Sequence, residues 1–142
     1  MLVCSPFGGA KAQIPPPVPN EPAEINACVC LHAAAAALAA GKDAKAQALA
    51  AVDRQLADLN AQLATEKPRV DVNSPASVSS YKVLLQRRDA AFGQLSPAQA
   101  AAAQAVDRYN ATVDEYNRRC IRPFNPELMA QISARPNCPP FR

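Results

Sequence analysis

Five cysteines and one histidine carry the widest chemistry in this 142-residue chain. Cys28, Cys30 and His32 stand two residues apart, while Cys120 and Cys138 lie near the C-terminus. Thiolate and imidazole groups are the ligands that soft metals prefer, and pairs of thiols form disulfides or exchange electrons. The pattern is therefore open to three readings, which are a metal site, a redox site and a disulfide framework.

A soft-metal site would have to use Cys28, His32 and Cys120. On a helix, residues four apart share a face and residues two apart do not, so Cys30 points away from Cys28 and His32. Zinc signatures usually contain Cys-x2-Cys or a second histidine pair, and haem attachment needs Cys-x-x-Cys-His. None of these occurs in the sequence. We therefore expect no metal and no cofactor, and we keep a soft-metal or redox protein as an alternative.

Other catalytic and nucleic-acid signatures are missing from the sequence. A single histidine leaves little room for acid–base or triad chemistry, and no glycine-rich phosphate loop occurs. The net charge is only +3, and the basic residues are scattered among acids. Nucleic-acid proteins usually show a denser basic stripe with stacking aromatic residues. The sequence predicts a protein that is not an enzyme and binds no nucleic acid.

The N-terminus suggests export. Residues 1–12 end in Ala10-Lys11-Ala12, the small-x-small pattern that signal peptidase cuts after, so we expect a remnant of a signal peptide that begins upstream of Met1. Cleavage there removes Cys4 and leaves four cysteines, the even number that a disulfide framework requires. A periplasmic or secreted location follows. Two alternatives are a tail that carries the triplet by chance and a lipoprotein anchored through Cys4.

Residues 13–23 are rich in proline and predict an extended linker. After it, apolar residues recur in steps of three and four, which is typical of a helix seam. The first such ladder consists of Leu49, Val52, Leu56, Leu59 and Leu63, and it extends back through Leu38, Ala35 and Leu31 to Cys28. Only Lys42 and Lys45, beside Gly41, interrupt it. We expect a helix over 24–66 that ends before Pro68.

A second ladder begins after Ser74-Pro75, a capping residue followed by a first-turn proline. Pro97 either bends this helix or breaks it, and the unbroken rhythm favours a bend. The helix should end near Arg119. The ladder positions are Val78, Tyr81, Leu85, Arg88, Phe92, Leu95, Gln99, Ala102, Val106, Tyr109, Val113, Tyr116 and Cys120.

Two ladders of similar length joined by a short loop predict an all-α fold. The expected domain spans 24–142 and is an elongated, coiled-coil-like antiparallel helical hairpin with a short C-terminal helix. The alternative is a compact three-helix bundle in which Pro97 turns the chain back. The apolar stretch 27–40 falls short of the roughly 20 residues that cross a bilayer, so we expect no integral membrane span.

Antiparallel pairing brings the start of the first helix beside the end of the second. Cys28 and Cys120 both lie on the seams there, which favours a Cys28–Cys120 disulfide. A short helix that begins after Asn125, with Leu128, Met129 and Ile132 on its apolar side, would return the tail and allow Cys30–Cys138. The swapped pairing stays open at this point. In either case the open end of the hairpin is clamped.

These features favour a non-catalytic protein-interaction module whose partner the sequence does not identify. Its candidate binding residues are Arg69, Asp71 and Asn73 in the loop 67–77. A homodimer is a further expectation, because two alanine-rich arms leave apolar surface exposed. The first alternative is a small inhibitor or immunity-type protein that inserts this loop into a secreted enzyme. The second is the soft-metal or redox protein described above.

Overall fold

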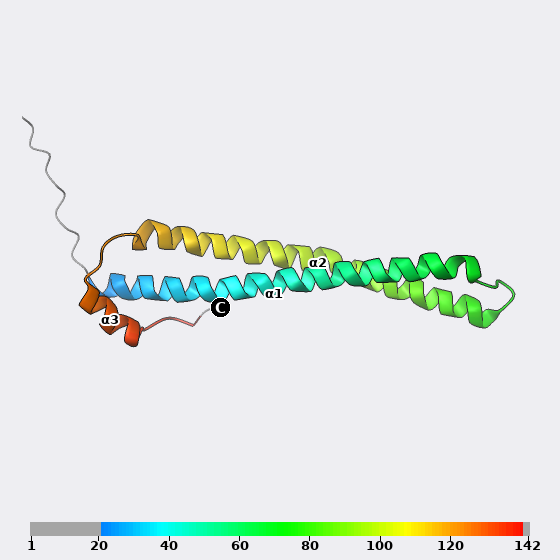
Figure 1. The fold of residues 1–142 in the computed structure, drawn as a ribbon, viewed down its shortest axis with the longest axis horizontal. Helices are drawn as coiled ribbons and strands as arrows, with labels where there is room; N and C mark the ends of the chain where they lie inside the picture. The colour runs from blue at the N-terminus through cyan, green and yellow to red at the C-terminus, as the bar shows by residue number, and fades with distance from the viewer. Residues whose placement is uncertain (1–20, 141–142) are drawn as a thin grey trace, which may run out of the picture.

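The computed structural model describes residues 21–140 and has four helical elements in this range: α1 (Pro22–Glu66), η1 (Lys67–Arg69), α2 (Pro75–Cys120) and α3 (Pro126–Ala134). The predicted signal-peptide remnant (1–12) and residues 13–20 of the predicted linker lie outside the described residues. Two long helices run antiparallel for their whole length, and α3 folds back against the start of α1 (Figure 1). No strand occurs between residues 21 and 140. The predicted all-α hairpin is therefore confirmed, and the compact bundle is wrong.

α1 begins at Pro22, two residues inside the stretch predicted to be linker. Proline is well suited to the first turn because its missing N–H has no partner there in any helix. Neither Gly41 nor Lys42 interrupts the helix, since alanine-rich flanks hold it together. Lys42 stays at the seam by reaching outward: its Nζ lies 2.9 Å from Asp43 Oδ1 and 5.7 Å from the centre of the Tyr109 ring. Lys45 is exposed.

The turn between the long helices is built by side-chain hydrogen bonds. Asp71 Oδ1 accepts from Asn73 N at 2.9 Å, and the Asp71 backbone N–H donates to Ser77 Oγ at 3.0 Å. Ser74 caps α2, since its Oγ accepts from Ser77 N at 3.3 Å. Asp71 therefore holds the turn in one conformation.

Pro97 neither breaks α2 nor turns the chain back, because α2 is one helix from Pro75 to Cys120. A proline inside a helix removes one hydrogen bond and crowds the carbonyl four residues earlier, which here belongs to Gly93. Glycine adjusts its backbone more freely than other residues. Packing against α1 along both sides of Pro97 keeps the two halves in line.

The seam of α2 differs from its prediction in the middle of the helix. Phe92, Gln99 and Val106 were expected to face α1, but all three are exposed. Their places are taken by the residues one position earlier, Ala91, Ala98 and Ala105, of which Ala91 is 1 % exposed. Small side chains let two helices approach more closely than a phenylalanine does, so the alanine positions become the contact. The larger residues are displaced to the edge of the seam.

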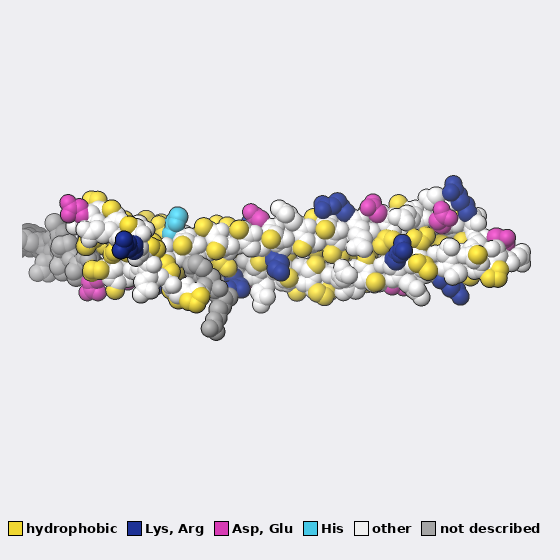
Figure 2. All heavy atoms as spheres, turned by 90° about the horizontal axis from the view of Figure 1, so that it is seen from below, with side chains coloured by type: hydrophobic (Ala, Val, Ile, Leu, Met, Phe, Trp, Pro, Cys, Tyr) yellow, Lys and Arg dark blue, Asp and Glu magenta, His cyan; other side chains and the backbone are white. Residues whose placement is uncertain are grey.

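The buried core is thin and concentrated at the two ends. The buried apolar residues of the described range are Ile25, Cys28, Cys30, Ala34, Leu59, Leu63, Ala91 and Cys120. Four of them belong to the first four turns of α1, beside the disulfides and α3. The space-filling view accordingly shows apolar side chains at the surface along the whole hairpin, with charges spaced widely between them (Figure 2).

By length and composition, the helical stretch Pro22–Arg69 is long and apolar enough to cross a membrane, contrary to the expectation from the sequence. Core helices of water-soluble proteins and signal sequences also meet this criterion. In the structure this stretch is paired with α2 along its length, and α2 carries charged residues between 82 and 89 and again between 107 and 119. A bilayer would have to accept those charges too, which is costly.

Candidate functional site

Two disulfides hold the end of the hairpin opposite the loop, which we call the clamped end. Cys28 bonds to Cys120 with a Cα–Cα distance of 5.6 Å, and Cys30 bonds to Cys138 at 5.3 Å. This is the pairing that the helix seams favoured, not the swapped one. The bonds are compatible with an oxidising compartment. They also occupy the thiols of Cys28 and Cys120, so these two do not join His32 as metal ligands.

The tail after α3 is fixed to α1 by more than its disulfide. Asn125 caps α3 through its Oδ1, which accepts from the backbone N–H groups of Glu127 and Leu128 at 2.9 and 3.1 Å. Beyond α3, the amide of Asn26 pairs with the backbone of Asn137 in both directions, at 2.8 and 2.9 Å. The tail thus returns along α1, as Figure 1 shows.

A charged cluster joins the start of α1 to the end of α2. Arg119 donates to both carboxylate oxygens of Glu24 at 3.2 Å and to Glu115 at 3.1 Å. Arg122 lies 3.3 Å from Glu24, and Arg118 also bonds to Glu115. These hydrogen bonds, led by that of Arg119, lower the pKa of Glu24, and those of Arg118 and Arg119 lower the pKa of Glu115. The same contacts raise the pKa values of Arg118 and Arg119.

The lowered pKa of Glu24 predicts a pH-dependent contribution to stability. A carboxyl whose pKa is lower in the folded state stabilises the fold above its ordinary value, here 4.5, and loses that effect as the pH falls through the folded pKa. Glu24→Gln should therefore lower Tm at pH 7, and this loss should shrink as the pH falls from 4.5 towards 3. Thermal unfolding followed by circular dichroism at both pH values measures this. Asp107→Asn, at a carboxylate without an ion pair in residues 21–140, is the control, and an equal loss at both pH values would contradict the prediction.

A small hollow lies beside the Cys28–Cys120 bond, between the long helices and α3. It measures about 380 Å³, and its walls include His32, Tyr116, Phe124 and Met129. The rings of His32 and Tyr116 are tilted against each other with centres 6.0 Å apart. Among the described residues, no group of three or more histidine, cysteine or acidic side chains is arranged to hold a metal. The histidine therefore packs beside an aromatic ring here.

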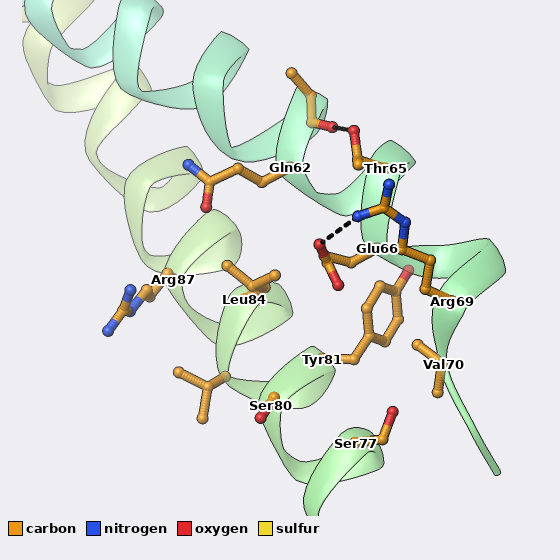
Figure 3. A pocket seen from close by; sticks show the side chains of 12 residues that line it. Gln62, Thr65, Glu66, Arg69, Val70, Ser77, Ser80, Tyr81, Leu84 and Arg87 are labelled. Atoms are coloured by element: carbon orange, nitrogen blue, oxygen red, sulfur yellow. Dashed lines mark hydrogen bonds and ion pairs between the residues drawn. The ribbon is translucent and has the colours of Figure 1, made fainter.

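A larger concavity lies at the other end, between α1 and α2 near the loop. Two adjoining hollows of about 800 and 690 Å³ share Gln62 and Arg87 and form one groove, which we call the loop-end groove. Its floor is apolar, with Leu59, Leu84 and Ala91 along the seam. In Figure 3, Tyr81 extends from α2 towards Glu66 and Arg69 at the loop end of the groove.

Three arginines, Arg54, Arg69 and Arg87, line the loop-end groove. Arg69 approaches Glu66 at 3.8 Å, which is a loose ion pair between exposed side chains. Arg54 and Arg87 form no ion pair with any residue in the range 21–140. In Figure 3 the Arg87 side chain extends away from the groove-lining side chains of α1. The groove thus combines an apolar floor with guanidinium groups that are free to bind carboxylates.

The three loop residues predicted to bind a partner have different surroundings. Arg69 lines the loop-end groove, whereas Asp71 and Asn73 do not. The Asp71 carboxylate bonds to the turn itself, so part of its hydrogen-bonding capacity serves the fold. Sequence reasoning missed Tyr81 and Arg54 as groove residues. Arg87 was not predicted to line a groove either, because helix register alone does not reveal where the surface is hollow.

No family model, curated protein or solved structure matches this chain. The loop-end groove offers binding chemistry: an apolar floor between two helices, rimmed by three arginines, hydroxyl groups and the carboxylates of Asp58 and Glu66. This combination suits a polypeptide segment with apolar and acidic side chains.

Proposed function

We propose that this protein is an exported, non-catalytic protein-interaction module that acts in the periplasm or outside the cell. It would bind a protein partner through the loop-end groove. The observation that carries the proposal is the groove itself, in which Arg54 and Arg87 stand beside an apolar floor without an ion-pair partner in residues 21–140. Guanidinium groups are among the residues enriched at protein interfaces, where they bind carboxylates bidentately.

The rest of the hairpin supports this proposal by making the groove rigid. A capped turn closes one end and two disulfides close the other, so the two walls keep their spacing. A preformed site loses less conformational entropy when it binds than a flexible one does. The disulfides also fit export, since they persist in oxidising compartments and are rare in the cytosol.

The groove length suggests the form of the partner segment. From Ala51 to Glu66 the groove follows α1 for about 15 residues, or roughly 23 Å at the helical rise per residue, and it continues to Arg69 in η1. A segment lying between two helices over that length matches the helix-in-groove mode of recognition, with apolar anchors three and four residues apart. Acidic residues on its flanks would meet Arg54 and Arg87.

A second candidate function has one observation in its favour. Val72 at the tip of the turn is 80 % exposed, although the turn around it is held by Asp71 and Ser74. A rigid tip with an exposed apolar side chain could enter the cleft of a secreted enzyme. This is the inhibitor or immunity-type role, and it uses the tip of the hairpin instead of its groove.

Site-specific photocrosslinking in the producing cells tests both functions. A photoreactive amino acid would replace Gln62 in the groove, Val72 at the tip, or Ala57 on the outer surface of α1. We expect a covalent adduct with a different polypeptide from position 62 and none from position 57. Arg87→Glu should reduce the adduct about tenfold, which corresponds to loss of a charge-assisted hydrogen bond.

The outcomes separate the two candidates. An adduct from position 72 alone would favour the inhibitor-type role. Equal adducts from positions 57 and 62, or no adduct from either 62 or 72, would contradict both. The intact mass of the mature chain tests export in the same preparation. We expect an N-terminus at Gln13 and four oxidised cysteines, and a mature chain that still begins at Met1 would contradict the predicted cleavage.

A further inference from the structure

A row of large apolar side chains runs along α2 at the edge of the seam, and we call it the apolar stripe. Its members recur every seventh residue, with Gln99 as the polar exception, and they are Val78, Leu85, Phe92, Val106 and Val113. In the middle of the helix the hairpin turns the preceding alanines inward instead, with Ala91 buried and Ala98 and Ala105 half-buried. This leaves Phe92 64 % exposed and Val106 40 % exposed.

The apolar stripe and the loop-end groove flank the seam on opposite sides. The groove uses Ser80, Arg87 and Gln94 of α2, which also recur every seven residues. In a helix with a seven-residue repeat, position 87 lies on one side of the seam residue 88, and position 92 lies on the other. A protein bound to the stripe therefore leaves the groove open.

The pattern of the stripe indicates what kind of surface covers it. A seven-residue apolar repeat fits another helix with the same repeat, because knobs then meet holes along its whole length. Phe92 and Val106 are also larger than the alanines of the internal seam. Exposed apolar rows of this kind mark protein–protein contacts more often than isolated exposed residues do.

This side of the hairpin carries charges of both signs. The charged residues that helical phase places beside the stripe are Asp53, Lys67, Lys82, Arg88 and Asp89, and Arg88 is paired with Asp89 at 2.7 Å. A surface with both signs can complement itself when two copies meet around a two-fold axis.

We infer that a second copy of this chain covers the apolar stripe, so that two hairpins form a four-helix bundle. From Val78 to Val113 the stripe is 35 residues, or about 53 Å, long. A contact along that length and two helix diameters wide buries roughly 1,000 Å² per copy. A standard stable interface needs about 800 Å² per partner, so the face is large enough. This inference does not rest on the proposed function.

Sedimentation equilibrium of the oxidised full chain tests the inference. Over about 1–100 µM, where interfaces of standard size associate, we expect a particle of twice the intact mass. Phe92→Glu and Val106→Glu should each shift the protein to a monomer. For Phe92→Glu the dimer Kd should rise at least about 30-fold, the effect of losing an interface hot spot.

Val83→Glu is the matched control, since Val83 is 42 % exposed but lines the loop-end groove. This variant should stay dimeric. Far-ultraviolet circular dichroism and the intact mass confirm that each variant is helical and oxidised. A monomeric wild type at 100 µM would overturn the inference, and so would a dimer that Val83→Glu breaks and Phe92→Glu does not.

Discussion

Replacing all four clamp cysteines by alanine is expected to lower the free energy of unfolding by roughly 8 kcal/mol, which is enough to leave the chain largely unfolded at 37 °C. Cys28–Cys120 joins residues 92 apart in sequence. In the chain-entropy model a loop of about 100 residues stabilises by about 4.7 kcal/mol. The second bond adds less, because the first has already brought its cysteines close together.

The size of the second contribution follows from the covalent ring that remains. With Cys28–Cys120 formed, Cys30–Cys138 closes a ring of about 20 residues, made of the segments 28–30 and 120–138. Such a ring stabilises by about 3 kcal/mol. The same ring is opened when Cys28–Cys120 alone is removed. Each single removal should therefore cost about 3 kcal/mol, and the double removal more than the two single costs together.

Urea unfolding of the wild type, Cys28→Ala/Cys120→Ala, Cys30→Ala/Cys138→Ala and the fourfold variant measures these values. The fourfold variant is expected to show little helical signal without added osmolyte. Reduction of the wild type with excess thiol should give the same low helical signal as the fourfold variant. Strictly additive costs, or a fourfold variant as stable as the wild type, would mean that the clamp does not act by restricting the unfolded chain.

Ile25→Ala is expected to lower the free energy of unfolding by about 2–5 kcal/mol, the usual cost of truncating a buried isoleucine. Ile25 is 0 % exposed and is the largest fully buried side chain in the described range. It lies one turn before Cys28, at the end where the core is concentrated. An alanine-rich hairpin has few other large buried side chains to offset the cavity.

The matched substitution is Val72→Ala, at a side chain that is 80 % exposed, and it should change stability by less than about 0.5 kcal/mol. Urea unfolding of the oxidised proteins, with equal m-values as a check, gives the difference. A loss below 1 kcal/mol for Ile25→Ala would show that the disulfides hold the clamped end without help from packing.

The fold was largely predictable because helix signals in this chain are local and repeated. The capping pairs Ser74-Pro75 and Asn125-Pro126 begin α2 and α3. The two apolar ladders of similar length predict that the long helices pair with each other in antiparallel order. The middle of the α2 seam was not predictable from hydrophobicity. There Ala91 faces α1 and Phe92 does not, because small side chains let the two helices approach more closely. The spacing of large apolar residues in the sequence does not reveal this distance between the helices.

The candidate site was less predictable than the fold. Arg69 was identified because it lies in a loop, but Tyr81 and Arg54 belong to helices whose pattern shows nothing unusual. A groove depends on how far two helices stand apart at each point, which is a tertiary property. The same holds for the tail, where the pairing of Asn26 with Asn137 joins residues 111 positions apart.

The position of both disulfides at one end has a mechanical consequence. Tension applied between Glu21 and Pro140 enters α1, crosses to the C-terminal segment at Cys28–Cys120 or Cys30–Cys138, and leaves through the tail. The long hairpin between Cys30 and Cys120 lies outside this load path. A protein tethered at its two ends would thus bear force through covalent bonds, and its groove would keep its shape under a pull that would peel apart an unclamped pair of helices.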